Sequence, residues 1–320
     1  MSVLIAFLSL AVEAKLGYPD RLFAAIGHPV TWIGRLISFI DHGLNRATDS
    51  DRTRRLCGVA ALVMIVAVPA FIAYAVERVL LLHALGFFVV IALGTTLLAQ
   101  KSLADHVEAV AKALDTDGLA AGREAVSRIV GRDPDQLDRA AVSRAAIESL
   151  AENFSDGVVA PAFWMAVGGL AGGAAYKAVN TADSMIGHRT PRHEAFGWAA
   201  ARFDDLVNLP ASRLTALLIV AAAAILPGMD ARAAWRAVWR DAGKHRSPNA
   251  GWPEAAMAGA LGIALAGPRS YNGVMGDYAY MGHGRRDVTA ADIRRALRLF
   301  WMADVLLMVG LGVVGFVLTA

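Results

Sequence analysis

The sequence contains a single cysteine, Cys57, among 320 residues. One cysteine excludes intrachain disulfides and any zinc site built from several thiolates. Charged residues are also scarce, at 18% of the chain. An apolar run at residues 2–12 has no cation before Lys15, so it lacks the positive region of a signal peptide. We expect this run to form an interfacial or partly inserted helix.

Several common functional motifs are absent too. The chain has no Gly-x-x-x-x-Gly-Lys-[Ser/Thr] loop and no Gly-x-Gly-x-x-Gly turn after a predicted strand. It has no Gly-x-Ser-x-Gly elbow and no His-Glu-x-x-His motif. No run of Lys and Arg with interleaved aromatics accompanies the net charge of +3, so no nucleic-acid partner is predicted. The positive charge fits basic loops beside an anionic membrane leaflet.

Long apolar runs are what the sequence does contain. Hydrophobic residues make up 56% of the chain and the mean hydropathy is +0.47, more than a soluble domain of this length needs. A membrane-spanning helix takes about 20 residues. The longest apolar runs are residues 57–76, 79–100, 157–176, 214–229 and 305–320. We therefore predict an all-α polytopic integral membrane protein with about five transmembrane or re-entrant helices, plus cytoplasmic and interfacial helices, in a single domain over residues 1–320.

The distribution of Lys and Arg bears on topology. Residues 17–56 hold six, residues 100–156 seven, residues 176–210 four and residues 229–299 eleven. The three richer segments are predicted to be cytoplasmic. Strict alternation of the spans would then place residues 176–210 outside. A broken or re-entrant helix at residues 157–176, which contain Pro161 and two Gly-Gly pairs, is one way to avoid this, and the membrane side of 176–210 stays open.

Two further segments have clear helical patterns. Residues 102–153 are predicted to be helical, with turns at 115–118 and 131–134. Residues 255–267 form a short run rich in Ala and Gly, which favours a helix packed closely against protein rather than lipid.

The first polar cluster lies at the boundary between a charged and an apolar segment, in the stretch AENFSDGVVAP. Glu152, Asn153 and Asp156 precede a run with no charge until Lys177. A carboxylate at the bilayer centre costs roughly 2.5 to 3.5 kcal/mol on insertion scales. We therefore expect these acids to sit in water or to bind a cation.

Two more clusters follow in apolar surroundings. In YKAVNTADSMIG, helical spacing puts Lys177, Asn180, Thr181 and Ser184 on one face, with Asp183 at its border. The alternative for this face is a polar seam between helices.

The third cluster is AARFDDLVNLP. Its side chains at i+3 and i+4 predict that Arg202, Asp204, Asp205 and Asn208 converge before Pro210. Carboxylate oxygens with substrate phosphates are the usual ligands of magnesium, so Asp183, Asp204 and Asp205 are predicted metal ligands.

Two histidine-containing islands complete the set. His28 opens HPVTWIG, and His245, Arg246 and Asn249 lie in HRSPNAG. A turn of the latter kind is typical of phosphate binding by backbone N–H groups together with an arginine.

These motifs carry a resemblance. HPVTWIG, GRD, ESLAENFSDGVVAPAFW, YKAVNTADSMIG, AARFDDLVNLPASRLT and HRSPNAGWPEAAMAGALG, in this order, resemble the CobD/CbiB family of cobalamin biosynthesis over nearly the whole chain. The resemblance implies an adenosylcobinamide-phosphate synthase. Such an enzyme is an ATP-dependent carbon–nitrogen ligase that joins adenosylcobyric acid, a corrinoid substrate, to aminopropanol phosphate or a related amino-alcohol phosphate. It also implies ATP and Mg²⁺ as cofactors and the bilayer of a bacterial cytoplasmic (inner) membrane as the location.

On this hypothesis each polar residue receives a role. The predicted catalytic residues are Glu152, Asp156, Lys177, Asp183, His28 and His245. The predicted substrate-binding residues are Asn153, Asn180, Ser184, Arg202, Asn208, Arg246 and Asn249. Either histidine would take the proton from the incoming ammonium. The acids of the first cluster are expected to mark the water-facing entrance of a site formed with the other two clusters.

Other readings stay open. Ionisable residues in broken helices also mark transporters, and the distantly similar AmpE family consists of sensory membrane proteins. No pair of matching hydropathy halves supports a transporter. Whether the chain forms a homo-oligomer or associates with other corrinoid-pathway enzymes is also open.

Overall fold

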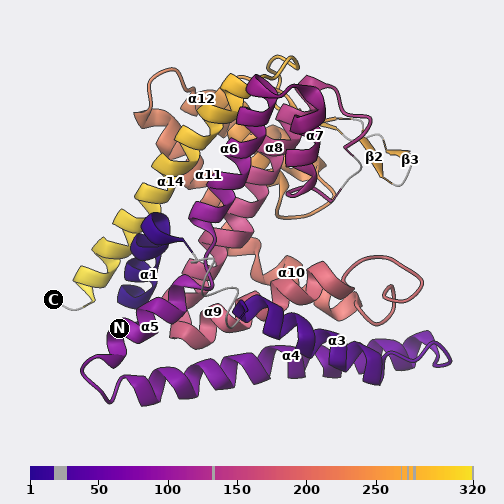
Figure 1. The fold of residues 1–320 in the computed structure, drawn as a ribbon, viewed down its shortest axis with the longest axis vertical. Helices are drawn as coiled ribbons and strands as arrows, with labels where there is room; N and C mark the ends of the chain where they lie inside the picture. The colour runs from indigo at the N-terminus through magenta and orange to yellow at the C-terminus, as the bar shows by residue number, and fades with distance from the viewer. Residues whose placement is uncertain (18–26, 132–133, 268, 272–273, 277–278, 319–320) are drawn as a thin grey trace. The chain divides into compact units, whose positions relative to one another are not determined.

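The computed structural model of the protein describes residues 1–17, 27–131, 134–267, 269–271, 274–276 and 279–318. Most of this chain is helical (Figure 1). The helices up to residue 127 are α1 (Ser2–Leu16), α3 (Pro29–Leu44), α4 (Asp51–Leu80), α5 (Gly86–Thr95), α6 (Gln100–Thr116) and α7 (Leu119–Ser127). The later helices are α8 (Arg139–Phe154), α9 (Ala160–Ile186), α10 (Trp198–Val207), α11 (Leu209–Ile225), α12 (Ala231–Asp241), α13 (Gly251–Leu261) and α14 (Ala290–Val317).

The remaining elements are short. A π-helical turn, η1 (Ser155–Val159), joins α8 to α9, and a 3-10 turn, η2 (Ala242–Lys244), follows α12. Strand β1 (Leu265–Ala266) pairs antiparallel with β4 (Tyr280–Met281), with Leu265 opposite Met281. Strand β2 (Arg269–Tyr271) pairs antiparallel with β3 (Val274–Gly276).

Four helical segments are long and apolar enough to cross a membrane, namely Asp51–Leu80, Gly86–Thr116, Arg139–Ile186 and Ala290–Val317. The pair α10 and α11 passes the same test together, which makes five. The surface of α4 agrees with a lipid environment, because Phe71 is 71% exposed and Leu56 is 65% exposed. The predicted all-α polytopic membrane protein is confirmed.

Two predicted runs have different bounds in the structure. The run at 79–100 is not one helix, because α4 continues to Leu80 and α5 begins only at Gly86, where a Cβ would run into the Leu80 carbonyl oxygen. The run at 255–267 is helical only to Leu261, since Gly262 adopts φ 67° and ends α13 in the left-handed conformation. Residues 255–261 are buried, as predicted for a helix packed against protein.

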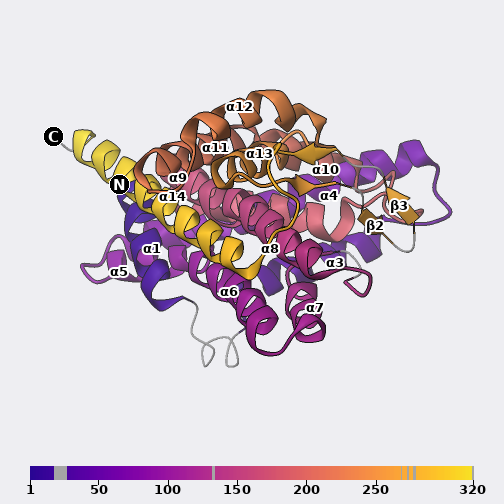
Figure 2. The ribbon, with the colours of Figure 1, turned by 90° about the horizontal axis from the view of Figure 1, so that it is seen from above.

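The segment predicted to be helical at 102–153 forms α6, α7 and α8, and the turn predicted at 115–118 separates the first two. Of the other predicted turn, residues 132–133 lie outside the described part. Figure 2 shows these three helices side by side.

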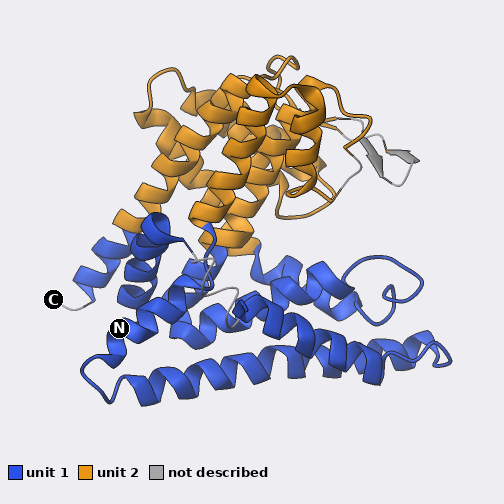
Figure 3. Cartoon of the chain, in the orientation of Figure 1, with its two compact units in different colours: residues 1–99, 160–208, 310–320 blue, residues 100–159, 209–309 orange. Residues whose placement is uncertain are grey.

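The chain divides into two compact units made from interleaved segments (Figure 3). The first unit comprises residues 1–99, 160–208 and 310–320, and the second comprises residues 100–159 and 209–309. In the first unit α9 is central. Its Ala178 packs with Ile37 of α3 and Ile65 of α4, while its Met165 packs with Ile5 of α1 and Val90 of α5.

A break interrupts α9 at the first Gly-Gly pair of the sequence. Gly168 and Gly169 have non-helical backbone angles, and Gly169 adopts φ 62° and ψ −152°. The Leu170 N–H, freed by the break, donates a 2.6 Å hydrogen bond to Oε2 of Glu77 on α4. A glycine is required, because a Cβ at 169 would clash with that carboxylate. The broken helix that was one alternative for residues 157–176 is thus found at this pair, whereas Gly172 and Gly173 are helical.

The second unit has its own core. The Phe154 ring of α8 packs edge-on against Phe300 of α14 at a centroid distance of 4.8 Å. Every residue of α13 except Trp252 is buried. Gly259 lets α13 approach α12 closely, since a Cβ there would lie 2.6 Å from the Ala234 Cα. Close helix contacts through small residues are typical of membrane proteins.

Candidate functional site: an acidic cluster between α9 and α10

The first unit brings two of the predicted clusters together. Asp204, on α10, is 9% exposed and lies beside the carboxylates of Asp183 and Asp205 and beside the amide of Asn180. Nδ2 of Asn208 donates a 3.0 Å hydrogen bond to Oδ2 of Asp204, as the i+4 spacing predicts. Within the described chain, Oδ1 of Asp204 is buried with no hydrogen-bond partner. A buried carboxylate oxygen without a donor is costly unless it binds something.

Helix α9 supplies the other side of this cluster. The Tyr176 hydroxyl donates a 2.8 Å hydrogen bond to Oδ1 of Asn208, and both side chains are almost fully buried. Trp164 Nε1 donates a 3.1 Å hydrogen bond to the Val207 carbonyl oxygen near the end of α10. At the end of α9, Gly187 lets the Asp183 side chain fold back, because a Cβ at 187 would run into Oδ1 of that residue. The hydrogen bonds of Tyr176 and Trp164 thus hold the C-terminal end of α10 against α9.

The remaining predicted residues of these clusters have less central positions. Arg202 Nη1 lies 3.6 Å from Oδ2 of Asp205, the predicted i+3 pair, and its side chain is 61% exposed. Ser184 is exposed and donates 3.0 Å to the Asn180 carbonyl of its own helix. Lys177 is half-buried and close to His28.

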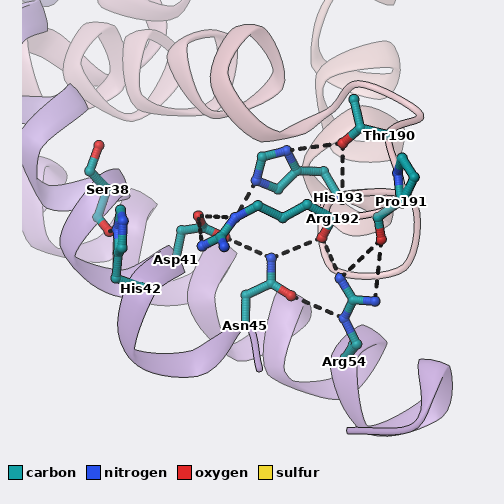
Figure 4. Close-up of polar contacts among 9 residues, drawn as sticks. All are labelled: Ser38, Asp41, His42, Asn45, Arg54, Thr190, Pro191, Arg192 and His193. Atoms are coloured by element: carbon teal, nitrogen blue, oxygen red, sulfur yellow. Dashed lines mark hydrogen bonds and ion pairs between the residues drawn. The ribbon is translucent and has the colours of Figure 1, made fainter. Parts of the chain in front are cut away.

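A polar cluster that sequence reasoning missed holds the segment between α9 and α10 (Figure 4). Asp41 of α3 is 6% exposed and accepts hydrogen bonds from Arg192 Nη2 at 2.7 Å and from Asn45 Nδ2 at 2.8 Å. Arg54 of α4 donates to Oδ1 of Asn45 at 3.0 Å and to the carbonyl oxygens of Pro191 and Arg192. His193 Nε2 lies 3.5 Å from Oδ1 of Asp41. The i, i+4 spacing of Asp41 and Asn45 was the available signal.

This cluster determines the charge state of Asp41. Burial alone would raise the pKa of its carboxyl group, but hydrogen bonds from Asn45 and Arg192 and the charge of Arg192 outweigh burial and hold the pKa below its usual value. Asp41 is therefore ionised at neutral pH.

The rest of the predicted residues lie in the second unit. Glu152 and Asn153 are exposed near the end of α8, and Asp156 is half-buried in η1. Asn153 donates 2.9 Å to the Ser149 carbonyl. Arg144 donates a hydrogen bond to the Arg286 carbonyl, and Glu148 accepts a 2.7 Å hydrogen bond from the Ala266 N–H.

The HRSPNAG turn is closed by its own side chains. His245 Nδ1 accepts from the Ser247 N–H at 3.0 Å, and Oγ of Ser247 accepts from the N–H groups of Asn249 and Ala250 at 3.1 and 3.3 Å. These backbone donors are thus occupied, so an anion here would rely on side chains such as the exposed Arg246. Arg213, which sequence reasoning did not single out, donates 2.8 Å to Oδ1 of Asn249.

In His28 and His245, the two predicted proton acceptors, one ring nitrogen already accepts a backbone hydrogen bond. Nδ1 of His28 accepts from the Val30 N–H at 3.2 Å and caps α3, and Nδ1 of His245 accepts from Ser247. A neutral ring in this arrangement carries its hydrogen on Nε2. Burial and the nearby Lys177 lower the pKa of His28, which keeps that ring neutral at pH 7.

A metal ion in the acidic cluster would need oxygens from outside the chain. Among the described residues, no group of three or more His, Cys, Asp or Glu side chains is arranged to hold a metal. Magnesium is compatible with this, because it is usually held by one or two carboxylates, waters and substrate phosphates. The unpartnered Oδ1 of Asp204 is the best-placed protein ligand.

Comparison with known proteins covers almost the entire chain. The model of the family described as CobD/Cbib protein matches residues 6–300. Cobalamin biosynthesis protein CobD of Rhizobium meliloti (strain 1021) is 52% identical over 304 residues, covering 94% of this chain and 93% of that protein. The proteins of the same name from Brucella suis and Rhodobacter capsulatus are 50% and 49% identical, and each alignment covers at least 95% of both chains. No significant match to a solved structure is found. This chain belongs to the CobD/CbiB family.

Proposed function

We propose that the chain is an adenosylcobinamide-phosphate synthase of cobalamin biosynthesis. It would join a propionate carboxylate of adenosylcobyric acid to the amine of aminopropanol phosphate or a related amino-alcohol phosphate, using ATP. The names of relatives half identical over nearly the whole chain support a role in cobalamin biosynthesis. The observation that carries the chemistry is the buried, unpartnered Oδ1 of Asp204 within a group of acids, because phosphoryl transfer from ATP requires a site for a divalent cation.

The proposed reaction has two steps. A carboxylate oxygen of adenosylcobyric acid attacks the γ-phosphorus of ATP, the bond to the β-phosphate oxygen breaks, and ADP leaves an acyl phosphate. The amine then attacks the acyl carbon, and the carbon–oxygen bond to phosphate breaks. The substrate ammonium loses two protons, of which one passes to a base and the other leaves with hydrogen phosphate. The carboxylate is activated because phosphate is a better leaving group than oxide.

The first unit would handle the phosphates. Asp204, with one neighbouring carboxylate of Asp183 or Asp205, would hold magnesium together with waters and substrate phosphates, and the bound ion would supply positive charge to phosphoryl oxygens. Lys177 and Arg202 would bind anionic oxygens, and Asn180 and Ser184 would orient the substrates, whereas the buried Asn208 would orient Asp204. The Tyr176–Asn208–Asp204 chain of hydrogen bonds fixes the direction in which Oδ1 of Asp204 points. A fixed ligand lowers the cost of reorganisation during reaction.

The residues of the second unit remain proposed substrate contacts. Glu152, Asp156 and Asn153 would bind polar groups of a substrate, and Arg246 with Asn249 would bind an anionic oxygen.

Proton uptake by either predicted base, His28 of the first unit or His245 of the second, would occur at Nδ1 and would break its backbone hydrogen bond. The location proposed for this multi-pass protein is the bacterial inner membrane.

The test is an assay of the purified, detergent-solubilised chain with adenosylcobyric acid, aminopropanol phosphate, Mg²⁺ and ATP. Corrinoid mass and ADP release are followed together. We expect a corrinoid product that carries the added aminopropanol phosphate, with one ADP released per product. Folded protein that yields no product with several amino-alcohol phosphates would contradict the proposal and favour a sensory or transport role.

A further inference from the structure

Helix α12 has an outward face made of tryptophan and arginine. Arg232, Trp235, Arg236 and Trp239 follow one another at i, i+3, i+4 and i+7, and all four are exposed. Trp235 is 44% exposed and Trp239 is 65% exposed. Tryptophan is a large side chain that is normally well buried in water-soluble surroundings. Two exposed indoles on one helix face therefore need an environment that accepts them.

The opposite face of α12 is fixed within the second unit. Ala234, Ala237 and Val238 are buried, and the helix contacts α13 through Gly259. Asp241, at the end of α12, is fully buried and accepts hydrogen bonds from Lys244 at 2.8 Å and from the Gly282 N–H at 2.9 Å. The helix cannot rotate to bury its indoles without losing these contacts. Figure 2 shows α12 at the margin of its unit, next to α11 and α13.

The exposed indoles are also held in place by neighbours. Trp239 packs edge-on against Trp235 at 5.6 Å and against Trp252 of α13 at 5.7 Å between ring centroids. The guanidinium of Arg213 lies over the Trp252 ring, 4.6 Å from its centroid. The three indoles therefore form one row of contacting rings, with the Arg213 guanidinium over the Trp252 ring. Small-molecule sites bury most of their ligand, whereas the indoles of Trp235 and Trp239 are exposed side by side on one helix face, which suits a broad surface better than a small ligand.

The position of α12 in the chain points to the surface of the bilayer. It begins at Ala231, a few residues after the apolar helix α11 ends at Ile225. Nη2 of Arg295 donates a 3.1 Å hydrogen bond to the Gly228 carbonyl oxygen in the turn between α11 and α12. Arg295 lies in the charged first part of α14, before the stretch of that helix whose only charged residue is Asp304. The turn before α12 is therefore level with the transition from charged to apolar residues in a membrane-spanning helix.

We propose that α12 lies in the headgroup region of the bilayer and binds anionic phospholipid. Trp235 and Trp239 would enter the interface, where tryptophan is enriched in membrane proteins. Arg232 and Arg236 would pair with lipid phosphates, since basic groups near an anionic leaflet are attracted to it. Residues 229–299 hold eleven Lys and Arg, and such an excess predicts that this part lies on the anionic cytoplasmic side. A second copy is disfavoured as the occupant, because the arginines of two such faces would repel each other. The inference is independent of the proposed reaction.

The experiment measures the depth of a spin label attached to the full-length protein in nanodiscs. Cys57→Ser removes the single cysteine, and Trp239→Cys then offers one labelling site. Ser127→Cys is the matched control, an exposed position of the same unit on α7. We expect the label at 239 to have a several-fold higher ratio of collisions with oxygen to collisions with a water-soluble nickel chelate than the label at 127. Equal ratios at both positions would overturn the proposal.

A second arm tests the lipid charge. Nanodiscs of phosphatidylcholine are compared with an equimolar mixture of phosphatidylcholine and phosphatidylglycerol. Arg232→Gln together with Arg236→Gln should reduce the collision ratio at 239 in the mixture and leave it unchanged in phosphatidylcholine.

An unchanged ratio in both lipids would contradict binding of anionic headgroups. Spin–spin broadening between two labelled chains would instead identify a second copy as the occupant and overturn the proposal. If Trp239→Cys does not fold, Arg236→Cys is the label site, Arg232→Gln alone tests the charge, and the same readouts decide.

Discussion

Asn208 joins Tyr176 to Asp204. Its Oδ1 accepts a 2.8 Å hydrogen bond from the tyrosine hydroxyl, and its Nδ2 donates 3.0 Å to Oδ2 of the aspartate. The two atoms of one buried amide are thus both used, and the orientation of the amide is determined by its partners. Oδ1 of Asp204 is the oxygen left for a ligand in the described structure.

Asp204→Asn should abolish most of the proposed ligase activity while the protein still folds. The asparagine keeps an oxygen that accepts from Asn208 but removes the negative charge. We expect a fall in kcat/KM of at least about 100-fold, because changes one layer further from a metal already cost 10-fold to 100-fold. The ADP-release assay over a range of Mg²⁺ concentrations checks this. Asp230→Asn, an N-cap of α12 where asparagine also caps well, is the control. Equal turnover of the two variants would refute the metal assignment.

Tyr176→Phe should lower both stability and activity modestly. The change removes one buried hydroxyl and leaves Oδ1 of Asn208 without that donor, which costs about 1–3 kcal/mol. Thermal unfolding in detergent measures the first effect. We expect kcat to fall further than KM rises, because Asp204 loses its fixed orientation. A variant with the melting temperature and kcat of the unchanged protein would show that the hydroxyl orients nothing.

Gly169→Ala should destabilise the protein strongly. Alanine would have to adopt φ 62° and ψ −152°, a region essentially restricted to glycine, at a cost of about 1–3 kcal/mol, and its Cβ would clash with the Glu77 carboxylate that caps Leu170. Gly310→Ala is the matched control, since no atom lies within 4 Å of a Cβ built there. Melting temperatures in detergent compare the two. If Gly169→Ala and Gly310→Ala have the same melting temperature, the break in α9 does not require a glycine at position 169.

Asp41→Ala should destabilise the first unit at neutral pH. It breaks the contacts to Asn45 and Arg192, at a cost of about 1–2 kcal/mol once the half-exposed position of the arginine is taken into account. Because the pKa of Asp41 is lowered on folding, the stabilisation is complete above the unfolded pKa near 3.9 and is lost as the pH falls through the folded pKa.

Melting temperatures from pH 7 to pH 3 test this dependence. The difference between the unchanged protein and Asp41→Ala should be constant from pH 7 to about pH 5 and should shrink below about pH 4. Glu194→Ala, an exposed carboxylate in the same segment, is the control and should change the melting temperature little. A difference that grows with acid would reverse the sign of the pKa shift.

Sequence patterns were most informative for contacts between residues that lie within one helical turn of each other. Asn208 meets Asp204 and Arg202 meets Asp205 because one helical turn brings i+3 and i+4 side chains together. The two Gly-Gly pairs made a break in α9 one alternative, and the structure breaks the helix only at the first pair. Glu77, which caps that break, is 93 positions away in the chain. No local pattern could have selected one pair over the other.

The sequence by itself determined the class of protein and its family, because bilayer thickness sets the length of apolar helices and because long motifs in order are specific. It also identified the acids of α9 and α10. Only the tertiary structure decided which acid keeps an unpartnered oxygen, that Asp41 and Arg54 hold the segment between these helices, and that the HRSPNAG turn satisfies its own backbone donors. These outcomes depend on contacts between residues distant in the chain, which burial and hydrogen-bond satisfaction select only once the helices have packed.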